Sequence, residues 1–174
     1  IAHLMDHRVH NPYCQVCIQA KAARKPRRRG TMVLGPKPEK FGDQVTGDHL
    51  ISKDGNGEGD DFFPGATTAV VMYDRATDWT DCFPKAQKSL EETLAAFRQF
   101  QGRGAKVKQF YGDNAGELRV GAQKMGWTNP TSTPGVSATN GLAERIVRRV
   151  KEGGRANVVQ AGSNKAWWPY AVAH

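Results

Sequence analysis

The chain has 174 residues, of which 39% are hydrophobic and 24% charged, and it carries a formal net charge of +8. Its length allows one domain with a substantial core plus an appendage. No stretch approaches the roughly 18 consecutive apolar residues of a membrane span, and no signal-peptide pattern is present, so we expect neither a membrane protein nor a secreted one. The three cysteines, an odd number, also favour a reducing compartment.

Residues 1–20 are dense in histidine and cysteine. Two histidines one helical turn apart and a CxxC pair could supply four ligands to a tetrahedral Zn²⁺ ion; these residues are His3, His7, Cys14 and Cys17. His10 could replace one of the two histidines. The alternative is a remnant of such a site that binds no metal.

Residues 21–40 are basic and rich in proline and glycine, which predicts a linker. Residues 21–29 hold six basic residues, residues 144–155 hold five against two acids, and residues 43–61 hold six acids and only Lys53. Basic segments on either side of an acidic centre predict a polyanion held at its sides and a cation in the middle. A flexible linker and a solvated helix face would explain the charges equally well.

From Phe41 onward the pattern of residues predicts a folded domain. We expect strands at 43–52, 66–77, 78–85 and 105–113, helices at 89–102, 115–126 and 142–162, and a short strand after 126. Ser89 and Glu92 form a capping box at the start of the first helix, whereas Gly153 and Gly154 weaken the last one. This order predicts an α/β fold, a mixed sheet flanked by helices.

Three acids stand at the ends of the predicted elements: Asp48, Asp113 and Glu144. If the first and fourth strands were neighbours, Asp48 and Asp113 would converge, and the last helix could bring Glu144 over them. Three carboxylates in one place repel each other unless a cation is bound, and Mg²⁺ or Mn²⁺ suits oxygen ligands. Singly, Asp48 could be a strand-edge acid, Asp113 a helix cap, and Glu144 the i,i+4 partner of Arg148.

Three blocks in the chain, TGDHL, YGDNAGE and TNGLAERIVRRVK, resemble in order the catalytic blocks of retroviral-type integrases, the rve superfamily. The closest likeness is to the copia-type branch of LTR retrotransposon Pol polyproteins, whose blocks commonly read DNGGE and QNGxxER. The resemblance covers about residues 41–174 and implies an RNase H-like fold. It also implies that Asp48, Asp113 and Glu144 form an acid triad that binds two Mg²⁺ or Mn²⁺ ions. The implied activity is DNA integration by metal-dependent phosphodiester cleavage and strand transfer.

The resemblance further implies which residues contact double-stranded DNA at the element ends and the target: Asn140, Arg145, Arg148, Lys151 and Arg155. On the same helix Leu142, Ile146 and Val150 form a separate face, which we expect to pack on the sheet. The resemblance to integrases also implies a homo-oligomer that acts in the nucleus after a stage in a cytoplasmic particle. Integrases also carry a zinc module of two histidines and two cysteines upstream, followed in the copia branch by a basic stretch.

These observations divide the chain into a zinc-binding-like segment (1–20), a basic linker (21–40) and an integrase catalytic core (41–174) that we expect to be truncated at its C-terminus. One departure concerns the 30 residues between Asp113 and Glu144, an interval shorter than the family usually has. Two alternative functions therefore remain. One is a decayed copy that binds nucleic acid and zinc without catalysis, and the other is a different RNase H-like nuclease or DDE transposase.

Overall fold

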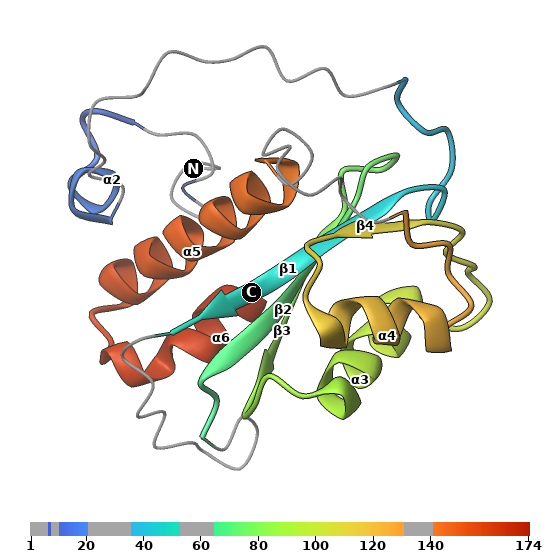
Figure 1. Ribbon diagram of the computed structural model, residues 1–174. Coiled ribbons are helices and arrows are strands. Elements are labelled where there is room, and N and C mark those ends of the chain that lie inside the picture. The colour runs from blue at the N-terminus through green and yellow to red at the C-terminus, as the bar shows by residue number, and fades with distance from the viewer. Residues whose placement is uncertain (1–6, 8–10, 21–35, 53–64, 131–140) are drawn as a thin grey trace.

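A four-stranded mixed sheet forms the centre of the computed structural model, which describes residues 7, 11–20, 36–52, 65–130 and 141–174 (Figure 1). The strand order is β3-β2-β1-β4. The strands are β1 (Val45–Ile51), β2 (Thr68–Asp74), β3 (Thr80–Lys85) and β4 (Phe110–Gly112). The first three strands form an antiparallel meander, whereas β4 runs parallel to β1. The mixed sheet predicted from the order of elements is therefore confirmed, and its first and fourth strands are neighbours.

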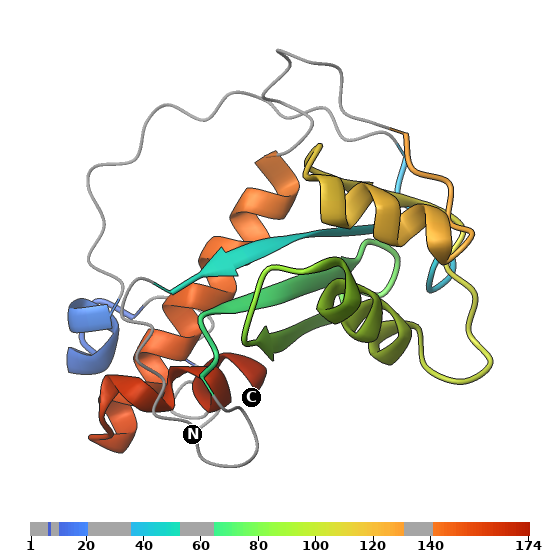
Figure 2. The same ribbon diagram turned by 60° about the horizontal axis from the view of Figure 1, so that its bottom comes forward.

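Helices cover both faces of this sheet, as Figures 1 and 2 show. One face carries α3 (Leu90–Gln101) and α4 (Gly116–Lys124), and the other carries α5 (Gly141–Ala161) and α6 (Trp168–Ala173). A 3-10 turn, η1 (Lys165–Trp167), leads into α6, and the short helix α2 (Gln15–Ala20) packs against α5. None of the helices in the described part of the chain is long and apolar enough to cross a membrane.

Strand β2 is buried along its whole length because both of its faces are covered. Successive side chains of a strand point to opposite faces, so Val70 and Met72 enter the core beneath α3 and α4. Val71 and Tyr73 enter the second core beneath α5 and α6. The sheet therefore separates two apolar cores and is held firmly between them.

The start of α3 follows the predicted capping signal in part. The backbone N–H of Glu92 donates to the Ser89 hydroxyl at 3.3 Å, as a helix N-cap requires. The Glu92 carboxylate, however, accepts the backbone N–H of Gln87 at 3.2 Å. Only the serine half of the capping box therefore forms. The glutamate instead stabilises the turn that precedes α3.

Helix α5 runs without a break through the two glycines that weaken it in the sequence. Gly154 is buried where α6 crosses, and a Cβ atom there would lie 2.5 Å from Cγ1 of Val172. A Cβ atom at Gly153 would meet nothing within 4 Å. Glycine at position 154 therefore lowers helix propensity but allows the close contact with α6. The sequence pattern does not predict α6.

We expect alanine to have opposite effects at these two neighbouring glycines. Gly153→Ala should raise the free energy of unfolding by up to about 1 kcal/mol, because alanine is the better helix former. Gly154→Ala should lower it by about 1–3 kcal/mol, the usual cost of overpacking, despite the same gain in propensity. Urea denaturation of the two variants measures the difference. Equal stabilisation by both would mean that α6 does not pack on Gly154.

Candidate active site and metal centre

The parallel pairing of β1 with β4 brings two of the predicted acids to neighbouring positions. The register pairs Thr46 with Tyr111 and Gly47 with Gly112, so the next residues along the two strands are Asp48 and Asp113. The Thr46 hydroxyl donates to the carbonyl oxygen of Tyr111 at 2.5 Å and ties the strands together just before the acids. Strand β1 lies between β2 and β4. Asp48 pairs with Val71 of β2, and it lies one residue beyond the last pair of β1 with β4.

Asp113 does not cap the helix that follows it. The N-cap of α4 is Ala115, and no side chain makes a capping hydrogen bond there. The Asp113 carboxylate accepts the backbone N–H of Asn114 at 2.6 Å and is exposed. The helix thus begins without help from Asp113, which leaves this carboxylate available for another purpose.

Glu144 lies in the first turn of α5 and is exposed. Within the described residues it forms no ion pair with Arg148, so the i,i+4 alternative is not realised. Burial raises the pKa of Asp48 above its usual value, the N–H of His49 donated to Oδ1 at 2.7 Å lowers it, and the negative charges of Asp113 and Glu144 raise it. The three acids therefore lie close enough to interact electrostatically.

The three carboxylates are neighbours without forming a tight cluster. Among the described residues, the group whose ligand atoms all lie within 4.8 Å of one another consists of His7, Cys14 and Cys17. A divalent ion would have to draw Asp48, Asp113 and Glu144 closer together.

His49, Lys88 and Glu117 lie near Asp48 on the other side of β1, and the sequence pattern does not predict this group. His49 points to the opposite face of β1, and both of its ring nitrogens are buried without a hydrogen-bond partner in the described part of the chain. Burial and the positive charge of Lys88 lower the pKa of His49 to about 4. Lys88 pairs with Glu117 at 2.9 Å, and its charge also lowers the pKa of Asp48. A neutral histidine and an ion pair thus lie near the part of β1 that carries Asp48.

Helix α5 has the two faces that the sequence predicts. Ile146 is buried in the second core, with Leu142 and Val150 packed against it. The described basic residues expected to contact DNA are all exposed: Arg145, Arg148, Lys151 and Arg155. Asn140 lies outside the described residues.

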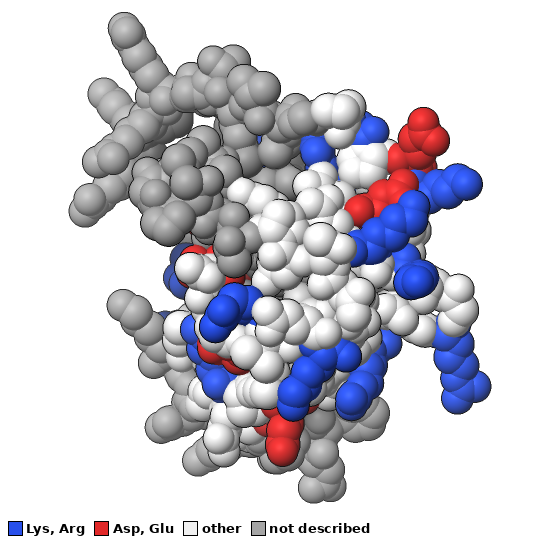
Figure 3. All heavy atoms as spheres, turned by 45° about the vertical axis from the view of Figure 1, so that its right-hand side comes forward, with Lys and Arg blue, Asp and Glu red and all other residues white. Residues whose placement is uncertain are grey.

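One basic residue of α5, Arg149, joins the helix to the sheet. Arg149 donates to the Thr80 hydroxyl at 2.9 Å and stands 5.9 Å from the centre of the Tyr73 ring, so it holds the helix to the sheet. On the side of the molecule that carries α3 and α4, Lys and Arg side chains are spread out rather than gathered into one patch (Figure 3). The exposed residues Arg145, Arg148, Lys151 and Arg155 of α5 are the candidate nucleic-acid surface.

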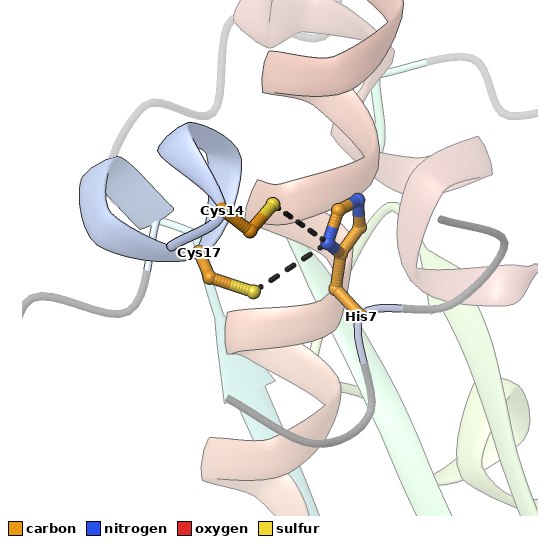
Figure 4. A group of neighbouring side chains, drawn as sticks. All are labelled: His7, Cys14 and Cys17. Atoms are coloured by element: carbon orange, nitrogen blue, oxygen red, sulfur yellow. Dashed lines mark hydrogen bonds between the residues drawn. The ribbon is translucent and has the colours of Figure 1, made fainter. Parts of the chain in front are cut away.

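The N-terminal segment brings three of the predicted zinc ligands together (Figure 4). Nδ1 of His7 lies 3.7 Å from Sγ of Cys14 and 3.5 Å from Sγ of Cys17. Zinc bonds of about 2.3 Å to sulfur and 2.0–2.1 Å to nitrogen, at tetrahedral angles, place such ligand atoms about 3.5 Å apart. The three residues therefore fit a tetrahedral zinc ion. His3, the predicted fourth ligand, and His10 lie outside the described residues.

His7 also joins this segment to the domain. Its Nε2 contacts Oε1 of Gln160, an exposed residue near the end of α5. Metal-binding histidines usually use their second ring nitrogen in this way, which fixes the tautomer and the direction of the ring. The contact therefore suits a metal ligand and connects the candidate zinc site to the helix that carries Glu144.

The fold is that of retroviral integrase catalytic cores, which are RNase H-like. The chain superimposes on the catalytic core domain of BIV integrase with a TM-score of 0.51 and 15% identity, over 75% of this chain and 78% of that one. A chain of the simian T-cell lymphotropic virus intasome, solved with the PP2A regulatory subunit B56 gamma, gives a TM-score of 0.58 and 14% identity. That superposition covers 91% of this chain and 55% of the other. At such low identity the likeness concerns the fold alone.

The sequence is similar to a retrotransposon protein. It is 35% identical over 113 residues to the retrovirus-related Pol polyprotein from transposon RE1 of Arabidopsis thaliana. This alignment covers 60% of the chain but 8% of the polyprotein, so the chain spans a small part of its relative's length. No protein-family profile matches the chain. The predicted resemblance to an integrase-type domain is thereby confirmed.

We expect the N-terminal segment to bind one zinc ion. Cys14→Ser should abolish zinc binding, because it removes a thiolate ligand. Cys82→Ser makes the same chemical change in a cysteine buried in β3 and should leave the zinc content unchanged. Elemental analysis of the reduced, purified chain and both variants measures the stoichiometry. A wild-type chain without zinc, or equal zinc in the Cys14→Ser variant, would contradict this assignment.

Proposed function

We propose that the chain is the catalytic domain of a retrotransposon integrase, which cleaves and joins DNA with two divalent ions, Mg²⁺ or Mn²⁺. The observation that carries this proposal is the parallel pairing of β1 with β4, which sets Asp48 beside Asp113. The electrostatic effect of Glu144 on Asp48 adds the third acid. The likeness to the transposon polyprotein and to the integrase core supports the same function.

The acids suit hard divalent cations. Carboxylate oxygens are the preferred ligands of Mg²⁺ and Mn²⁺, and the pKa of Asp48 is raised by burial and by the charges of Asp113 and Glu144. A cation between them would stabilise the ionised form of Asp48 and offset the repulsion. Asp48 lies on β1 and Asp113 directly follows β4, so the pairing of these strands would position both ligands, while Glu144 would approach from α5.

The proposed reaction is an in-line displacement at a DNA phosphodiester. Asp48, Asp113 and Glu144 would hold the divalent ions, which would supply activation of the attacking oxygen and charge stabilisation of the leaving one. The oxygen of water, in end trimming, or of a DNA 3′-hydroxyl, in joining, bonds to phosphorus as the bond to the leaving 3′-oxygen breaks. No residue of the chain becomes covalently linked to DNA in this scheme.

The exposed basic row of α5 would hold the DNA. Arg148 and Lys151 stand one and two turns beyond Glu144 on the same exposed face of α5. A strand whose scissile phosphate reaches the acids would pass these side chains. Their contacts would position the backbone and carry no sequence information directly.

The short interval between Asp113 and Glu144 is the feature that favours a decayed copy. The charge of Glu144, which raises the pKa of Asp48, supports the opposite reading, in which the third acid acts with the other two. The His/Cys segment and the basic residues that follow it favour an integrase over another RNase H-like nuclease or transposase. We propose double-stranded DNA and further copies of the chain as its partners, and the nucleus as its place of action.

The first test of this function is the loss of one carboxylate. Asp113→Asn keeps the shape of the side chain but removes its charge, so joining of a short DNA duplex in Mn²⁺ should be abolished and Mn²⁺ affinity lowered. Folding should survive, because a repulsion between like charges is relieved. Asp43→Asn is the matched control, since Asp43 precedes β1 and pairs with Lys108 at 2.6 Å.

These two aspartate variants separate the candidate functions. Wild-type joining by the Asp113→Asn variant would show that the acids are not the catalytic triad. A wild-type chain that binds Mn²⁺ and DNA but joins nothing would identify a decayed copy. Cleavage without joining would favour another nuclease.

The second test concerns the basic row of α5. Changing both Arg148 and Lys151 to glutamate should weaken binding to all duplexes alike and flatten the salt dependence by about two units of slope, because two phosphate contacts are lost. The control reverses Arg103 and Lys106, two exposed residues in the loop before β4. Binding isotherms at several salt concentrations compare the two double variants. Equal slopes for both would leave the α5 residues as ordinary surface charge.

A further inference from the structure

Asp48 follows Gly47 and Asp113 follows Gly112, and both glycines lie against the ring of Phe110. A Cβ atom at Gly112 would be 2.7 Å from Cε1 and 2.9 Å from Cζ of Phe110. A Cβ atom at Gly47 would be 2.8 Å from Sδ of Met72 and from the carbonyl oxygen of Val71, and 3.1 Å from Cε2 of the same ring. Carbon atoms in contact prefer about 3.5–4.0 Å. The ring of Phe110 therefore occupies the space of a side chain at Gly112, and at Gly47 it shares that space with Met72 and the backbone of Val71.

The pleat of the sheet explains this arrangement. Phe110 and Gly112 are two residues apart on β4 and share one face, and the register pairs Gly112 with Gly47 on β1. The ring of Phe110 extends over Gly112 and across to Gly47. It thus covers both strands at the last pair of residues before Asp48 and Asp113.

The ring of Phe110 has no room to move away. It is fully buried, with its centre 5.0 Å from that of Phe97 and 6.1 Å from that of Trp127. Trp127 is itself fixed, because its indole N–H donates to Oε1 of Gln101 at 2.9 Å. The backbone N–H of Phe110 donates to the carbonyl of Thr128 at 2.9 Å, which holds β4 from its outer side.

We propose that the ring of Phe110, seated on Gly47 and Gly112, is the positioning element that sets the carboxylates of Asp48 and Asp113 for metal binding. This inference rests on the proposed function. The ring lies on the core side of the strands and the Asp48 and Asp113 side chains follow one residue later, so Phe110 acts through the backbone. Metal ligands tolerate errors of about 0.2 Å. A methyl group at Gly112 must displace either the ring or the strand, and the displacement reaches the adjacent aspartate.

The test is a double-mutant cycle read out as Mn²⁺ affinity, measured by titration with electron paramagnetic resonance. Gly112→Ala should weaken Mn²⁺ binding about tenfold, the loss typical when the support of a metal ligand is disturbed. Phe110→Leu should also weaken it, because the strand ends lose the ring that spans them. The double variant should bind Mn²⁺ more tightly than Gly112→Ala alone, because the added methyl group fills space that the ring has left.

Gly121→Ala is the matched control. A Cβ atom at Gly121 would lie 3.2 Å from Cε2 of Phe97, so this change strains the same aromatic cluster from α4, but no aspartate follows it. Its Mn²⁺ affinity should equal that of the wild-type chain. Circular dichroism confirms that each variant is folded before Mn²⁺ is added.

The outcomes separate this inference from the proposed function. If Asp113→Asn binds Mn²⁺ as the wild-type chain does, the proposed metal site itself is wrong. If Asp113→Asn loses Mn²⁺ while folded Gly112→Ala retains wild-type affinity, the positioning role of Phe110 is overturned and the metal site stands. Should Gly112→Ala fail to fold, Phe110→Leu decides alone, and unchanged affinity in that folded variant overturns the proposal.

Discussion

Two carboxylates repel each other where β4 ends beside the middle of β1, and the rest of the structure depends on holding them there. Burial and the charges of Asp113 and Glu144 raise the pKa of Asp48, so the ionised site opposes folding when no cation is present. The strand register, the hydrogen bond from Thr46 to Tyr111 and the aromatic core beneath β4 hold the strands together against this repulsion. A divalent cation bound between the carboxylates would offset this repulsion, and their combined negative charge would favour its binding.

The two helix layers contribute differently to the placement of Asp48 and Asp113. The layer of α3 and α4 supplies Phe97 and, with Trp127, encloses Phe110. The layer of α5 carries Glu144 and the exposed basic row, and it is held down by Arg149 and by α6 at Gly154. The contact of His7 with Gln160 adds the N-terminal segment to α5. One helix therefore joins the third acid, the proposed DNA surface and the candidate zinc site.

Much of this arrangement can be predicted from the sequence because it depends on residues that are close together in the chain. Strand and helix periodicity gives the order of elements, and the spacing of His7, Cys14 and Cys17 gives three members of a metal site. Whether Asp113 caps a helix cannot be decided locally, because it depends on where α4 begins. The role of Gly47 and Gly112 is also hidden, since it arises from a ring that contacts two strands distant in sequence. The packing of α6 on Gly154 is hidden for the same reason.

The most direct test of the central claim is anomalous diffraction at the manganese edge from crystals of the chain grown with Mn²⁺. The account predicts two peaks about 3.5–4 Å apart, with Asp48 between them and with Asp113 and Glu144 as further ligands. Peaks at other carboxylates, or Mn²⁺ bound without contact to Asp48 and Asp113, would contradict the account.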